Sequence, residues 1–414
     1  MRHTRWAHWA AALSASALVI TGLAGAPAGA AVGSVAPAPR PTASAPVERF
    51  LKLWTPEFMG RGHGPYTNAE LTAMAKRFSL IVTMPKRFTA SVALMKAANP
   101  ALELAVYRNA TFATGRLAES TYAHTASGER IHSLKWPTTY LMELGSPAWR
   151  AQVDTTCTTM VRASKYDYCY LDVLGNGPLI SGDYMSGVPV GADGKAWTPN
   201  QWITWAAAIS ASAAKALGRP QYGNGLGTGE RYFNPSYASS PLVAPNKQVA
   251  AEGFVRNARG DIGLFLPEAQ WKQEVDMIVD TEARGKGMMA ITKLWVDATE
   301  QQRNRWHSYT LATFLLGSNG RSKFCFLRDE TPEAVEMDHP YNQIDVGTPT
   351  GAYAKWKGVY RRDFTKALVL VNPSTTSRTV PLTRAYTTLS GQSVSGSIDV
   401  RPNTARILLV PGSP

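Results

Sequence analysis

Short apolar segments alternate with amphipathic helical segments along most of this 414-residue chain, and this alternation constrains the fold more than any other feature. Each of three helical segments begins with a capping box, a Thr followed three positions later by Glu or Gln: Thr67–Glu70, Thr198–Gln201 and Thr299–Gln302. Strands connected by helices form a parallel sheet, and a closed barrel needs eight of them. The pattern therefore predicts an α/β fold of the (β/α)8 TIM barrel type. The strand candidates are Phe50–Phe58, Leu80–Pro85, Leu102–Asn109, Tyr168–Leu174, Gln221–Leu226, Val249–Val255, Met288–Trp295 and Lys323–Leu327.

The two ends of the chain differ from this repeating part. Residues 1–31 carry Arg2 and Arg5 before a short apolar run that ends in small residues, which is typical of a signal peptide cleaved near Ala30 or Ala31. An uncleaved membrane anchor is the alternative, but Ser and Thr interrupt the run. Residues 32–47, rich in Pro and Ala, are expected to be a disordered linker. The barrel would take residues 48–350, and short extended runs between Asn, Pro and Gly turns predict a small C-terminal antiparallel β domain over residues 351–414.

A signal peptide would make this a secreted, extracellular protein, where disulfides persist. Cys157 lies in the predicted helix 147–164 and Cys169 opens the next strand, so we expect a disulfide between them, with Cys325 left over and buried. The formal charge of +13 favours attraction to acidic polymers of a cell wall, although it could serve solubility alone. Because the basic residues are dispersed, we expect no nucleic acid partner. No later segment is apolar enough for stable membrane insertion.

Two strand candidates end on a carboxylate. Asp172 follows an apolar run and precedes a loop rich in Gly and Asn, and Glu252 follows the small apolar residues Val249–Ala251. The C-terminal ends of the strands form the catalytic rim of a TIM barrel, so both carboxylates are predicted to face one site, two strands apart. Hydrolysis of a glycosidic bond needs such a pair: one carboxylate acts at the anomeric carbon and one carboxylic acid protonates the leaving oxygen.

The apolar surroundings of Glu252 predict burial, which would raise its pKa as an acid catalyst requires. Each carboxylate also has a structural alternative. Asp172 could cap its loop, and Glu252 could pair with Arg256 or Lys293.

Other polar and aromatic residues are expected at the same strand ends. Sugar hydroxyls need oriented amides and charged groups, whereas the C–H face of the ring stacks on Trp or Tyr. Glu57 and Arg328 could instead form ion pairs at the rim, and Lys293 could neutralise a carboxylate. The candidates for substrate binding are Trp54, Glu57, Tyr107, Asn109, Asn224, Lys293, Trp295 and Arg328.

Several of these motifs resemble a known family, the secreted bacterial group called hypothetical glycosyl hydrolase family fifteen. The resemblance covers about residues 49–327 and is more distant to the α-galactosidase superfamily of barrel glycosidases. It implies a retaining glycoside hydrolase in which Asp172 is the nucleophile and Glu252 the acid/base, although α-galactosidases use Asp on the sixth strand. The motifs that carry the resemblance are Leu51–Trp54, Lys96–Pro100, Tyr107–Ala110, Tyr168–Asp172, Tyr222–Gly225 and Ala251–Glu252.

Other chemistries have less support in the sequence. The histidines are scattered without the spacing of metal ligands, so neither a metal nor a cofactor is predicted. There is no Gly-x-Ser-x-Gly elbow for a serine nucleophile. The alternatives are a carbohydrate-binding protein on a barrel that has lost catalysis and an enzyme of another type, such as a lyase. The loops 111–140 and 175–197 are expected to shape the site, the first as a wall or as a cover over the side of the barrel.

Overall fold

The computed structural model of this chain describes residues 50–59, 65–328 and 339–412. The predicted signal peptide (1–31) and linker (32–47) lie outside the described residues. The predicted barrel is confirmed, because eight parallel strands form one sheet in the order β1-β2-β3-β6-β7-β8-β9-β10. The strands are β1 (Trp54–Pro56), β2 (Leu80–Thr83), β3 (Glu103–Asn109), β6 (Tyr168–Asp172), β7 (Tyr222–Asn224), β8 (Gln248–Glu252), β9 (Met288–Lys293) and β10 (Lys323–Leu327).

A single bridge closes this sheet into a barrel. Leu53 pairs in parallel with Phe324, and the Phe324 N–H donates to the Lys52 carbonyl at 2.9 Å. Most strands are shorter than the sequence predicts, although β10 has the predicted bounds, and after β6 and β8 the chain leaves the extended conformation early. Val173 follows β6 with φ 61°, and Gly253 follows β8 with φ 103°. Each of the two strands therefore ends on its carboxylate.

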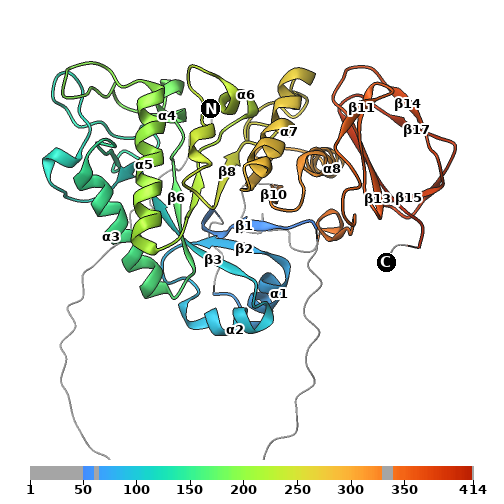
Figure 1. The fold of residues 1–414 in the computed structure, drawn as a ribbon, viewed down its shortest axis with the longest axis horizontal. Coiled ribbons are helices and arrows are strands. Elements are labelled where there is room, and N and C mark those ends of the chain that lie inside the picture. The colour runs from blue at the N-terminus through green and yellow to red at the C-terminus, as the bar shows by residue number, and fades with distance from the viewer. Residues whose placement is uncertain (1–49, 60–64, 329–338, 413–414) are drawn as a thin grey trace, which may run out of the picture. The chain divides into compact units, whose positions relative to one another are not determined.

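Helices connect the strands on the outside of the barrel (Figure 1). All three predicted capping boxes are present, at the starts of α1, α5 and α8. The loop between β3 and α3 carries the hairpin β4 (Phe112–Ala113) and β5 (Tyr140–Leu141). The helices are α1 (Asn68–Arg77), α2 (Val92–Ala98), α3 (Pro147–Ser164), α4 (Gly177–Ser181), α5 (Pro199–Leu217), α6 (Gly229–Phe233), α7 (Glu268–Ala283) and α8 (Glu300–Gly317), with short 3-10 turns at Glu57–Met59, Thr89–Ser91, Glu119–Thr121, Ser240–Leu242 and Pro340–Gln343.

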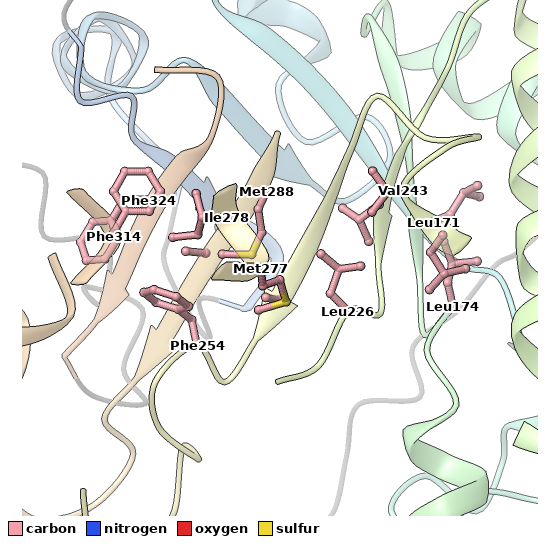
Figure 2. Packing of buried hydrophobic residues seen from close by; sticks show 14 of the residues in the cluster. Leu171, Leu174, Leu226, Val243, Phe254, Met277, Ile278, Met288, Phe314 and Phe324 are labelled. Atoms are coloured by element: carbon pink, nitrogen blue, oxygen red, sulfur yellow. The ribbon is translucent and has the colours of Figure 1, made fainter. Parts of the chain in front are cut away.

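Side chains alternate along each strand between the helices and the barrel interior. Figure 2 shows outward residues such as Leu171 of β6 and Met288 of β9 in the same apolar layer as Ile278 of α7 and Phe314 of α8. The inward residues form a second, separate cluster that includes Tyr170, Ala250 and Met289. On β6, β7 and β8 the residues that end each strand share the inward parity.

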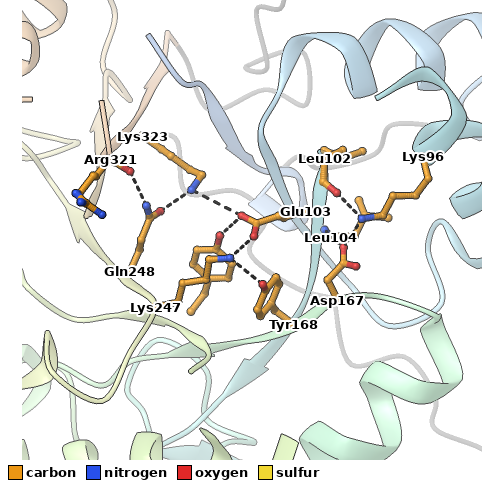
Figure 3. Close-up of polar contacts among 11 residues, drawn as sticks. Lys96, Leu102, Glu103, Leu104, Asp167, Tyr168, Lys247, Gln248, Arg321 and Lys323 are labelled. Carbon is orange, nitrogen blue, oxygen red and sulfur yellow. Dashed lines mark hydrogen bonds and ion pairs between the residues drawn. The ribbon is translucent and has the colours of Figure 1, made fainter. Parts of the chain in front are cut away.

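The other end of the barrel is filled by a charged cluster (Figure 3). Glu103 of β3 accepts hydrogen bonds from Lys247 and Tyr222, and Lys323 of β10 lies 3.8 Å away. Lys247 also donates to the Tyr168 hydroxyl at 2.7 Å. Burial lowers the pKa of Lys323 to about 8, although Glu103 opposes this change. Glu103 thus pairs with two lysines at this end, whereas Asp172 and Glu252 lie at the opposite ends of their strands.

Two antiparallel sheets follow the barrel, as the sequence predicts. Their strands occur from Ala354 onward, although the domain boundary at residue 350 stays a prediction. One sheet has the order β11-β12-β13-β18-β15-β16 and the other pairs β14 with β17. The strands are β11 (Ala354–Trp356), β12 (Val359–Asp363), β13 (Ala367–Asn372), β14 (Arg378–Pro381), β15 (Tyr386–Thr388), β16 (Ser393–Val394), β17 (Ser397–Val400) and β18 (Thr404–Leu409).

A buried arginine joins these sheets to the barrel. Arg362 of β12 donates through one guanidinium nitrogen to the carbonyls of Leu315, Leu316 and Ser318. These carbonyls belong to the last turn of α8 and its C-cap, where the helix has no intrahelical donors left. Burial lowers the pKa of Arg362 to about 10.

The predicted disulfide is present. It joins Cys157 of α3 to Cys169 of β6 with a Cα separation of 5.7 Å and links a barrel strand to the helix before it. Cys325 is free and buried in the barrel interior, as expected. In the described parts of the chain, no helix has the length and apolar character needed to cross a membrane.

Candidate active site

The carboxylates of Asp172 and Glu252 lie together at the C-terminal ends of the strands. Asn224, which ends the intervening strand β7, donates from its side-chain nitrogen to both of them. Both distances are 2.8 Å, so the two accepting oxygens lie no farther apart than twice that value, 5.6 Å. The sequence pattern predicted that these three side chains share one end of the barrel, and the structure brings them into direct contact.

The backbone of the two loops behind this pair is closely packed. A Cβ atom on Gly175, after β6, would lie 2.3 Å from the Gly225 carbonyl oxygen, and one on Gly225 would lie 2.2 Å from the Gly175 nitrogen. Only glycine allows the two chains to approach this closely. The Leu174 N–H also donates to the Asn224 carbonyl at 2.8 Å. These contacts hold the ends of β6 and β7 together, and thereby fix Asp172 relative to Asn224.

Asp172 lies in an environment that favours its protonated form. Burial and the nearby charge of Glu252 raise its pKa to about 6, although hydrogen bonds from Asn224 and Tyr107 oppose this change. The Tyr107 hydroxyl donates to the second Asp172 oxygen at 2.8 Å. Burial and Asp172 in turn raise the pKa of Tyr107 well above its usual value, so this tyrosine remains a hydrogen-bond donor.

Glu252 lies in the opposite electrostatic environment. Burial acts to raise its pKa, but the charge and hydrogen bond of Lys293, together with Asn224, outweigh burial and lower it. Lys293 ends β9 and forms an ion pair with the Glu252 oxygen that Asn224 does not contact. The expectation of a raised pKa at Glu252 is therefore wrong, because the sequence pattern does not reveal how close the ammonium lies. The alternative pairing with Lys293 is present alongside the carboxylate pair.

Besides Tyr107, a second predicted aromatic residue, Trp295, lies close to this group. The Lys293 ammonium lies 4.3 Å from the centre of a Trp295 ring. The side chain is partly exposed, although its indole nitrogen is buried and has no hydrogen-bond partner within the described part of the chain.

Four other candidates are engaged elsewhere. Trp54 is fully buried and donates to the Ala290 carbonyl across the barrel, so it offers no face to a substrate. Asn109 accepts hydrogen bonds from the backbone of Thr111 and Phe112, which uses its carbonyl to fix the loop.

Glu57 and Arg328 follow the ion-pair alternative. Glu57 accepts from Thr83 and Arg87. On β10 the side chains of Cys325 and Leu327 face the barrel interior, so Arg328, the next residue, faces the helices. It donates to Glu300 and Asn304 of α8. These four residues are thus held by the protein itself.

Sequence reasoning missed two residues of this region. Tyr184, in the loop between β6 and α5, has its pKa raised by burial and then by the charges of Asp172 and Glu252. Lys135, in the loop between β3 and α3, contributes to the lowering of the Glu252 pKa. Both residues reach the site through long loops without a sequence motif. The sequence offered one sign of this region, a basic residue next to an aromatic one in the loop 111–140, namely Lys135 and Trp136.

The described residues contain no group of three or more His, Cys, Asp or Glu side chains placed to hold a metal ion. A (β/α)8 barrel with two adjacent carboxylates at the C-terminal ends of its strands is the arrangement found in barrel glycosidases.

The sequence comparison identifies the family within this class. The chain belongs to hypothetical glycosyl hydrolase family 15, whose model matches residues 104–368, and the protein is therefore a glycoside hydrolase. This match confirms the resemblance found in the sequence motifs. No curated protein matches the chain.

Similar solved structures are also glycosidases. A maltogenic α-amylase from Thermotoga neapolitana has 10% identity and a TM-score of 0.49, over 87% of this chain and 98% of that one. The glycoside hydrolase domain of PelA from Pseudomonas aeruginosa has 15% identity and a TM-score of 0.39, over 66% of this chain and 93% of the domain.

Proposed function

We propose that this protein is a secreted, retaining glycoside hydrolase that cleaves a poly- or oligosaccharide with Asp172 and Glu252. The observation that carries this proposal is the Asn224 amide, which donates a hydrogen bond to each carboxylate. Because both bonds are 2.8 Å long, the two accepting oxygens lie at most 5.6 Å apart. Carboxyl groups about 5–5.5 Å apart are typical of retaining enzymes, whereas inverting enzymes need about 6.5–9.5 Å to admit water. The bridged pair therefore supports retention.

In this mechanism one carboxylate attacks the anomeric carbon while the glycosidic bond breaks, and the other carboxylic acid gives its proton to the leaving oxygen. The product is a covalent glycosyl-enzyme. The residue that gave up its proton then takes a proton from water. The water oxygen attacks the anomeric carbon, and the bond to the nucleophilic carboxylate breaks. The hydrogen bonds from Asn224 and Tyr107 would keep the two carboxylates in position through both steps.

Two assignments of roles are compatible with this pair. The family resemblance implies that Asp172 attacks and Glu252 donates the proton. The contacts favour the reverse assignment in the free enzyme, because Lys293 lowers the pKa of Glu252, whereas burial and the charge of Glu252 raise the pKa of Asp172 to about 6. Under the first assignment, substrate binding must move the proton from Asp172 to Glu252. Both assignments require the pair to hold one proton.

Turnover on a panel of polysaccharides and activated aryl glycosides tests the function. We expect activity in the wild type and a loss of at least about 10³-fold in Asp172→Asn and in Glu252→Gln. The exposed residues Asp399, on β17, and Glu129 provide matched controls, because Asp399→Asn and Glu129→Gln remove the same charges without touching the pair. Binding of sugars by all these proteins without any turnover would instead support the carbohydrate-binding alternative.

Azide rescue separates the two role assignments. Azide entering the space left by a missing nucleophile, in an Ala variant, gives a glycosyl azide of inverted configuration. In a variant that lacks the acid/base, the covalent intermediate still forms from an activated substrate, and azide gives the retained configuration. Inverted product from Asp172→Ala would support Asp172 as nucleophile. Inverted product from Glu252→Ala would support the reverse assignment.

Secretion is supported by the N-terminal sequence pattern and by the Cys157–Cys169 disulfide, which suits an oxidising compartment. Expression of the whole chain in a secreting bacterial host tests this part of the proposal. We expect protein in the culture medium that begins near Ala31. Retention of the full chain in the cells would contradict secretion.

A further inference from the structure

An ordered turn in the loop between β3 and α3 presents two exposed side chains, Lys135 and Trp136. The Ser133 hydroxyl accepts hydrogen bonds from the backbone N–H groups of Lys135 and Trp136, both at 3.2 Å. The N–H and hydroxyl of Thr139 donate to the Trp136 carbonyl at 2.8 and 2.7 Å. Within this fixed turn, Trp136 remains 54% exposed. A large apolar side chain that is held in water by an ordered backbone is typical of an interaction site.

Tyr184 connects this turn to the carboxylates. The Leu134 N–H donates to the Tyr184 carbonyl at 2.9 Å, and the Trp136 ring lies edge-on to the Tyr184 ring at 6.1 Å. The Tyr184 ring also contacts the Phe112 ring at 5.6 Å, and the Phe112 N–H donates to Asn109, which pairs with Asp172 across β3 and β6. These contacts place the turn at the end of the barrel that carries the carboxylate pair, and the charges of Asp172 and Glu252 add to the effect of burial in raising the Tyr184 pKa.

Lys135 brings a positive charge to the same place. Its ammonium lies 5.1 Å from the centre of the Tyr184 ring, and its charge contributes to the lowered pKa of Glu252. Within the described part of the chain, Lys135 forms no ion pair with a carboxylate. A cation beside an exposed indole, with no acidic partner from the protein, is suited to an anionic ligand with an apolar face.

We infer that Lys135, Trp136 and Tyr184 form a subsite for a sugar that carries a carboxylate, such as a uronic acid, next to the bond that is cleaved. This inference rests on the proposed function. The C–H face of the sugar would stack on Trp136 while its carboxylate pairs with Lys135. A protonated amino sugar would be repelled from the same position.

The test compares each acidic oligosaccharide with its own carboxyl-reduced form, which differs only in charge. The probes are hexamers of galacturonate and of hyaluronan, and binding is measured by calorimetry at 150 mM salt on Asp172→Asn protein, so that no cleavage occurs. We expect the acidic form of at least one probe to bind about 5- to 10-fold more tightly than its reduced form. Lys135→Gln should remove this difference and leave the affinity for the reduced form unchanged.

Two further variants separate the subsite from general charge attraction. Trp136→Ala should weaken binding of the acidic and reduced forms alike, because both stack on the indole. Lys76→Gln removes one exposed positive charge on α1 and should leave the preference intact. The inference is overturned if no acidic probe binds, if acidic and reduced forms bind equally, or if Lys76→Gln removes the preference as Lys135→Gln does.

Failure of the subsite can be distinguished from failure of the proposed function. Turnover that depends on Asp172 and Glu252, together with no preference for acidic probes, would overturn the subsite alone. A preference that depends on Lys135, without turnover of any substrate by the wild type, would support the subsite as a binding site and contradict the hydrolase.

Discussion

Replacement of Lys293 by Met tests how the carboxylate pair holds its proton. Met has a similar length but no charge, so Lys293→Met removes the cation that pairs with Glu252. An adjacent opposite charge lowers a carboxyl pKa by about 1–3 units. The Glu252 side chain is 31% exposed and that of Lys293 9%, so solvent screens part of the interaction. We therefore expect the variant to raise the Glu252 pKa by about 1–2 units, or about 1.4–2.7 kcal/mol.

The assay is the pH dependence of kcat/KM on an activated aryl glycoside. The singly protonated pair is the active state, so activity falls at low pH when Glu252 is protonated and at high pH when Asp172 is ionised. In the wild type the alkaline limb should lie near pH 6, where the raised pKa of Asp172 places it. Lys293→Met should move the acid limb upward by about 1–2 pH units and narrow the active range.

Two matched variants complete this experiment. Lys293→Arg keeps the charge and should keep the acid limb near its wild-type position. Lys76→Met removes a charge from the exposed surface of α1 and should move neither limb. An acid limb that stays in place in Lys293→Met, in a protein that melts like the wild type, would refute the idea that Lys293 controls the ionisation of Glu252.

Three further predictions concern the same structure. Asn224→Ala removes the donor shared by both carboxylates and should lower kcat/KM by about 10²-fold, because each lost bond to a charged group costs about 1.5–3 kcal/mol; an effect below tenfold would contradict the bridging role. Burial raises the Asp172 pKa to about 6, so its stabilising contribution is complete below about pH 4 and is lost as the pH rises through 6. Urea unfolding should therefore show Asp172→Asn gaining about 1–3 kcal/mol relative to the wild type between pH 4 and 7, whereas a constant difference would contradict the raised pKa. The disulfide closes a loop of sequence separation 12, so the double variant Cys157→Ala with Cys169→Ala should lose about 3 kcal/mol of unfolding free energy, and no loss would show that the bridge is absent in solution.

The barrel could be predicted from sequence because its signals are local. Apolar runs, capping boxes and turn residues each act within a few positions, and together they allow few folds. The alternation of side chains along a strand also places Asp172, Asn224 and Glu252 at the barrel end, since each is the last residue of an inward-facing series. The structure brings these three side chains into contact.

The remaining features of the site depend on distances that a sequence pattern does not contain. The pKa of Glu252 depends on the ammonium of Lys293, which lies on another strand, and apolar neighbours alone suggested the wrong direction. Trp54 was placed at the rim because it is aromatic and near a strand end, but the barrel interior covers it completely. Tyr184 and Lys135 reach the site through long loops, whose paths are set by tertiary contacts and carry no periodic signal.

The contact between Arg362 and α8 has a consequence for how this protein could be divided or recombined. The carbonyls at the end of the last barrel helix take their donor from a strand beyond residue 350, so a chain that stopped there would leave them unpaired. The family match likewise extends through β12 to residue 368. The C-terminal sheets are therefore not an exchangeable appendage: a chimera that takes them from a relative must bring an arginine at this position, and a shortened enzyme must retain at least the first two of their strands.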